Sequence, residues 1–113
     1  LAMLSELLQR PTQAPAVVVA AIAHGELLAL QPFSAGNGVV ARAYAQIVLA
    51  QRGLDPDLLA MMDVGLTTLG RAAYVRALRA YDAGDGVAEW CIHIASAFER
   101  GALLSRTALE ELV

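Results

Sequence analysis

The apolar segment over residues 14–30 constrains the fold of this chain more than any other part of the sequence. A helix built from this segment is apolar on nearly every face, which is typical of a helix surrounded by other helices. A His-Gly-Glu triplet at residues 24–26 interrupts the segment, which is also too short to cross a bilayer comfortably. The sequence therefore predicts a buried central helix over residues 15–30, which ends because Pro32 restricts the residue before it.

Good helix formers such as Ala, Leu, Arg and Glu dominate the rest of the chain, and alternating strand-like runs are absent. We therefore expect an all-α fold. Besides the central helix, the pattern predicts helices over residues 1–9, 38–52, 55–63, 68–81, 86–100 and 105–112. The clearest amphipathic stripe belongs to the helix over residues 86–100 and consists of Val87, Trp90, Cys91, Ile94, Ala95 and Phe98.

Turn and cap residues set the predicted helix boundaries. Gly53 is expected to end the helix over residues 38–52, because helices often end at a glycine. Asp55 followed by Pro56 is expected to cap the next helix. Ser105 is expected to cap the last one.

The size and hydropathy of the chain predict a partner for its apolar surface. A chain of 113 residues is expected to form a single domain, residues 1–113. Hydrophobic residues make up 58% and the mean hydropathy is +0.54, so part of the apolar surface should be covered by something else. Because the first residue is Leu1, we expect the C-terminal part of a longer protein. Its partner would be the upstream part of that protein or a homo-oligomer.

Charge, cysteine content and the lack of targeting segments limit the partners and the location that the sequence predicts. The net charge is −3, the pI is about 5.2 and the eight basic residues are scattered arginines, which predicts no nucleic-acid partner. Cys91 is the single cysteine, so an internal disulfide is excluded and a cytoplasmic location is expected. With no signal peptide and no spanning segment recognised, no membrane partner is predicted.

The Gly36-Asn37-Gly38 loop between the two central helices is suited to bind an anion. Glycine permits positive φ, and the next helix presents its positive end to the same place. Arg42 lies one turn into that helix and can lean back toward a bound phosphate. The alternative is a glycine-rich interhelical turn with Arg42 in a structural salt bridge.

The longer segment Gln31-Pro32-Phe33-Ser34-Ala35-Gly36-Asn37-Gly38-Val39-Val40-Ala41-Arg42 resembles the signature of the Fic/Doc (Fido) family. That signature reads His-Pro-Phe-x-Asp/Glu-Gly-Asn-Gly-Arg-x-x-Arg. The resemblance implies a Fic-like helical bundle and the transfer of AMP from ATP to a protein hydroxyl, called adenylylation. Weaker likeness extends over residues 16–105. The β-hairpin flap of the family would precede this chain, so we expect the flap region to be absent from it.

Three substitutions fall on the positions that carry the chemistry of the family. Gln31 replaces the histidine that acts as general base, Ala35 replaces the acid that binds Mg²⁺, and Val39 replaces the first phosphate-gripping arginine. The resemblance implies Mg²⁺ and ATP, but the three substitutions predict no catalytic residue, no metal site and no cofactor. The retained candidates for binding an anion or nucleotide are Gly36, Asn37, Gly38 and Arg42.

Three functional hypotheses follow from these residues. The first is a Fic-fold pseudoenzyme that binds a phosphate-bearing small molecule or a protein without nucleotidyl transfer. The second is an enzyme with altered phosphoryl- or nucleotidyl-transfer chemistry on another phosphorylated ligand, with His24 as its base. The third is an all-helical interaction domain whose motif is a coincidence, for which residues 31–42 would form one continuous helix.

Overall fold

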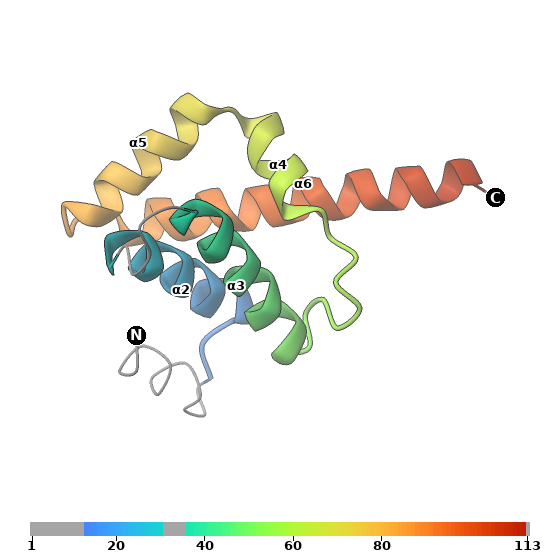
Figure 1. Ribbon diagram of the computed structural model, residues 1–113, viewed down its shortest axis with the longest axis horizontal. Helices are drawn as coiled ribbons and strands as arrows, with labels where there is room; N and C mark the ends of the chain where they lie inside the picture. The colour runs from blue at the N-terminus through green and yellow to red at the C-terminus, as the bar shows by residue number, and fades with distance from the viewer. Residues whose placement is uncertain (1–12, 31–35, 113) are drawn as a thin grey trace.

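The computed structural model describes residues 13–30 and 36–112, which form helices and the turns between them (Figure 1). The helices are α2 (Ala16–Leu30), α3 (Asn37–Gln51), α4 (Met62–Leu69), α5 (Arg71–Asp82) and α6 (Val87–Leu112). No strand occurs in these two ranges, so the predicted all-α fold is confirmed for the described chain. The helix predicted over residues 1–9 lies outside the described residues.

Small side chains let α2 approach its neighbours closely. α2 packs along α3 and also contacts α5 and α6, so three other helices cover it. Figure 1 shows α2 beside α3. Its buried face is rich in alanine, and the facing positions of α3 are alanines too. The alanines concerned are Ala20, Ala21, Ala23, Ala41 and Ala45. The predicted central helix is confirmed.

Trp90 of α6 is the largest fully buried side chain among the described residues. Its indole N–H donates a hydrogen bond of 2.7 Å to the backbone oxygen of Ala21 in α2. Four further rings surround it, with centroids between 5.2 and 6.3 Å away. They belong to His24, Tyr74, Tyr81 and His93. The indole therefore joins α2, α5 and α6, as its place on the predicted stripe requires.

The end of α3 follows its local sequence. Gly53 has a φ of 82°, a conformation that glycine adopts at little cost. The N–H of Leu54 donates to the oxygen of Leu49 and the N–H of Gly53 to that of Ala50, the paired bonds of a Schellman motif. The predicted stop at Gly53 is confirmed.

The helix predicted over residues 55–63 is wrong. The carboxylate of Asp55 accepts hydrogen bonds from the N–H groups of Leu59 and Ala60, at 2.9 and 3.0 Å. These donors lie four and five residues ahead, whereas a helix cap serves donors two or three residues ahead. Leu58 also has a φ of 55°, which interrupts any helix there. The carboxylate closes a loop instead, and the helix begins later as α4.

The single helix predicted over residues 68–81 is also wrong, because the chain breaks at Gly70. Gly70 has a φ of 96° and a ψ of 149°, a conformation that side chains other than hydrogen do not tolerate. Thr68 therefore belongs to the end of α4, and α5 begins at Arg71.

The break predicted between residues 100 and 105 is absent, because α6 runs without interruption to Leu112. Gly101 is buried, and a Cβ placed there would lie 2.4 Å from the backbone oxygen of Met61. Ser105 does not cap a helix, contrary to the prediction. Its hydroxyl donates a hydrogen bond of 2.5 Å to the backbone oxygen of Leu59. Both residues hold the segment before α4 against α6. None of the described helices is long and apolar enough to cross a membrane.

Substituting Gly65 tests the close contact between α4 and α6. A Cβ on Gly65 would lie 1.9 Å from the backbone oxygen of Ala97, so Gly65→Ala must separate the two helices. We expect the free energy of unfolding to fall by about 1–3 kcal/mol despite the better helix propensity of alanine. Chemical denaturation measures it, with Thr68→Ala on the exposed side of α4 as control. Equal stability of the two variants would contradict the contact.

Candidate functional site

The start of α3 lies at the Gly-Asn-Gly sequence, as predicted. Gly36 is exposed and left-handed, with a φ of 77° and a ψ of 14°, and α3 begins at Asn37. The carbonyl oxygen of Gly36 accepts the first helical hydrogen bond, from the backbone nitrogen of Val40 at 3.0 Å. Because Gly36 is left-handed and α3 begins at Asn37, no continuous helix runs through Gly36. A coincidental motif match would favour one continuous helix over residues 31–42, and the left-handed Gly36 argues against that helix.

Arg42 leans back over the start of its own helix. A Cβ placed on Gly38 would lie 3.1 Å from Nη1 of Arg42, so the guanidinium covers this glycine. Such a direction is expected for a helical side chain one turn further on. Gly38 thus leaves room for the guanidinium at the helix start.

Arg42 also forms the salt bridge that the structural alternative predicts. Its Nε lies 3.0 Å from Oδ1 of Asp63 in α4. The Asp63 side chain is 67% exposed, so the pair contributes little to stability, typically under about 1 kcal/mol. The ion pair therefore orients the guanidinium without burying it.

A pocket of about 480 Å³ brings Arg42 together with residues from α4 and α5. It contains two arginines, two hydroxyl groups and one carboxylate, a combination that suits an anion with several oxygen atoms. The lining residues are Arg42, Asp63, Leu66, Thr67, Arg71 and Tyr74.

Arg71 is the site residue that the sequence did not reveal. It is the first residue of α5, whose first turn has no acidic side chain, and Gly70 gives no side-chain cap. A cation at the positive end of a helix is unfavourable unless an anion is close. The sequence did not predict the break at Gly70. In a single helix over residues 68–81, Arg71 would lie inside the helix and not at its first position.

His24 lies behind the pocket and contacts it through Tyr74. Its Nε2 lies 2.9 Å from the hydroxyl oxygen of Tyr74. Burial, then the charge of Arg42, then His93 lower the pKa of His24 to about 4, so the imidazole is neutral at pH 7. Burial raises the pKa of Tyr74 although Arg42 acts in the opposite direction, so this hydroxyl keeps its proton.

Two imidazole nitrogens in this region have no hydrogen-bond partner within residues 13–30 and 36–112. They are Nδ1 of His24 and Nε2 of His93, and both are buried. Burial also lowers the pKa of His93. A protonated imidazole would be unstable at either place.

Of the three substituted motif positions, only that of Val39 lies among the described residues. Gln31 and Ala35 lie outside the described residues, and Val39 is a 62% exposed residue of α3. No group of three His, Cys, Asp or Glu side chains within the described ranges could hold a metal ion. Asp63, the carboxylate of the pocket, is held by Arg42. The residues present here do not fit Mg²⁺, whose preferred ligands are carboxylate and phosphate oxygens.

The fold and site define an all-helical protein with an arginine-lined pocket at the start of two helices. The sequence model of the Fic/DOC family matches residues 1–49, a range that contains α2, the motif and most of α3. No curated protein and no solved structure matches the chain. The resemblance to the Fic/DOC family is thus confirmed for the part that carries the motif, while α4, α5 and α6 lie beyond the match.

The pH dependence of stability tests the buried state of His24. The pKa of His24 is about 4 in the folded protein and 6.5 in the unfolded chain, so the unfolded chain binds the extra proton between these values. Stability is therefore lost as the pH falls from 6.5 toward 4, by on the order of 3 kcal/mol from this group.

Denaturant titrations between pH 7.5 and 4.5 measure this loss in the wild type and in His24→Gln. Glutamine keeps an acceptor for Tyr74 but does not titrate, so the variant should lose less stability on acidification. His93 titrates in both proteins and is the internal control. Parallel pH profiles would show that His24 is not buried as described.

Proposed function

We propose that this chain is a Fic-type protein that binds a phosphate-bearing small molecule in the pocket of Arg42 and Arg71 and transfers no nucleotide. The observation that supports this proposal best is that arginines from two separate helices line one pocket. One of them also covers Gly38 of the retained motif.

The chemistry of the pocket suits a phosphate group better than a carboxylic acid or a neutral ligand. Guanidinium presents parallel donors that match two phosphate oxygens, and two arginines can hold two oxygen pairs. Tyr74 keeps its proton, so its hydroxyl adds no negative charge beside Arg42. The Thr67 hydroxyl donates to the backbone oxygen of Asp63, so the two arginines are the donors on which the proposal rests. A phosphate would compete with Asp63 for Arg42, at little cost because the Asp63 side chain is largely exposed.

The substitutions in the motif support binding without transfer. Gln31 has no titratable group, and loss of a general base typically lowers a rate by about 10²–10⁴. Val39 and Ala35 remove a phosphate contact and a metal ligand of the family pattern. His24, the base that an altered chemistry would use, contacts Tyr74 and has a pKa of about 4, which makes it a weak base. We therefore favour the binding protein over the altered enzyme.

Calorimetric titration with inorganic phosphate, AMP and ADP tests the proposed ligand class. We expect binding by the wild type, and about 10–100-fold weaker binding by Arg42→Ala and by Arg71→Ala, because each loses a charge-assisted contact. Arg100→Ala is the matched control, since Arg100 is an exposed residue of α6 outside the pocket. Identical isotherms for the wild type and both pocket variants would remove the proposal.

A further inference from the structure

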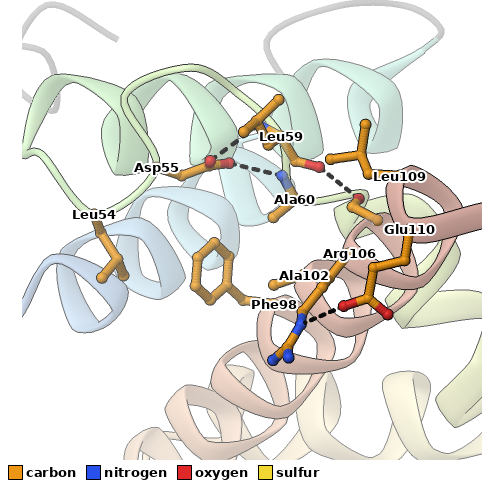
Figure 2. Close-up of a pocket in the computed structure, with 10 residues that line it drawn as sticks. Leu54, Asp55, Leu59, Ala60, Phe98, Ala102, Arg106, Leu109 and Glu110 are labelled. Carbon is orange, nitrogen blue, oxygen red and sulfur yellow. Dashed lines mark hydrogen bonds and ion pairs between the residues drawn. The ribbon is translucent and has the colours of Figure 1, made fainter. Parts of the chain in front are cut away.

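A second pocket, an apolar groove of about 820 Å³, lies between the loop before α4 and the C-terminal half of α6 (Figure 2). It is unrelated to the arginine pocket, because the two share no lining residue. Most of its lining is aliphatic or aromatic, with a few polar groups at its edge. The lining residues are Leu54, Asp55, Leu59, Ala60, Phe98, Ala102, Ser105, Arg106, Leu109 and Glu110.

Hydrogen bonds fix the loop side of the groove. The carboxylate of Asp55 is itself buried and holds the N–H groups of Leu59 and Ala60 (Figure 2). From α6, the hydroxyl of Ser105 donates to the carbonyl oxygen of Leu59. The loop is thereby tied both to itself and to α6, so the groove is formed before anything binds in it.

The apolar stripe of α6 continues beyond the bundle. Phe98, Ala102, Ser105, Leu109 and Leu112 recur at spacings of four and three residues, so they share one face of the helix. The last turns of α6 extend past the other helices in Figure 1. There Leu109 is 52% and Leu112 is 83% exposed. An apolar stripe that is this exposed is typical of a helix surface that packs against another molecule.

The charges beside the stripe indicate which molecule covers it. Arg106 and Glu110 lie on the same flank of α6, with Nε and Oε1 3.0 Å apart. When two copies of a helix pack antiparallel about a two-fold axis, the same flank of each helix faces the other copy. A residue on one side of the axis then faces the residue that lies equally far from the axis on the other side. In such a pair Arg106 faces Glu110 of the second copy, and Glu110 faces the second copy's Arg106. The flank is therefore complementary to itself.

We propose that a second copy of this chain covers the groove by packing its α6 antiparallel against α6. The axis lies near Ala108, midway between the two charged residues. The two Leu109 side chains then meet near the axis. Leu112 of each copy lies over the Ser105 end of the groove of the other. The exposed leucines at the end of α6 are covered, and four charges form two intermolecular pairs.

Sedimentation equilibrium over about two decades of protein concentration tests this contact. We expect a monomer–dimer equilibrium for the wild type and a monomer for Leu109→Asp. Leu103→Asp is the control, because Leu103 is an equally exposed leucine of α6 that does not line the groove. Circular dichroism checks that both variants fold. A wild type that is monomeric throughout, or equal dissociation by both variants, would overturn the proposal in favour of another occupant.

A charge exchange separates intermolecular pairing from the i,i+4 pair within one helix. Arg106→Glu and Glu110→Arg each place like charges on the flank, so each alone should associate at least tenfold more weakly than the wild type. Mixed in equal amounts, they should form a heterodimer, because every charge then meets its opposite across the axis. The intrahelical pair stays broken in both chains, so recovery on mixing can come only from the second copy. Failure to recover overturns the antiparallel arrangement.

Discussion

The buried indole of Trp90 is the contact on which the rest of the bundle depends. Its N–H reaches the backbone of α2, and its ring lies against side chains of α2 and α5, so one residue of α6 joins three helices. Much of the remaining core is alanine, which allows close approach but offers little buried area. A large ring in an alanine-rich core therefore supplies a disproportionate share of the packing.

The same ring cluster positions the arginine pocket. His24 contacts Trp90 edge to face and bonds Tyr74, and Tyr74 lines the pocket beside Arg42. Because His24 is neutral, it orients the hydroxyl of Tyr74 without adding charge to a region that already has two arginines. The core of the protein and the proposed phosphate site are thus connected through side chains rather than through the backbone loop alone.

Local signals in the sequence predicted those parts of the structure that local interactions decide. The start of α2, the stop of α3 at Gly53 and the direction of Arg42 all follow from residues within one or two turns. The uninterrupted α6 depends on contacts with a distant segment, such as the bond of Ser105 to Leu59. The loop after Asp55 depends on hydrogen bonds to donors four and five residues ahead, and an Asp-Pro pair does not distinguish this loop from a helix cap. The break at Gly70 depends on the conformation of one glycine. Arg71 was missed because the break at Gly70, which makes Arg71 the first residue of α5, was not predicted.

We propose that the retained motif serves binding and not transfer. The most direct measurement is incubation of the protein with ATP labelled on the α-phosphate, with Mg²⁺ and with a cell lysate, followed by acid precipitation. We expect no acid-stable label on the protein or on any lysate protein, because Gln31, Ala35 and Val39 lack the groups that the transfer requires. Acid-stable label that depends on Mg²⁺ and disappears in Asn37→Ala would contradict it.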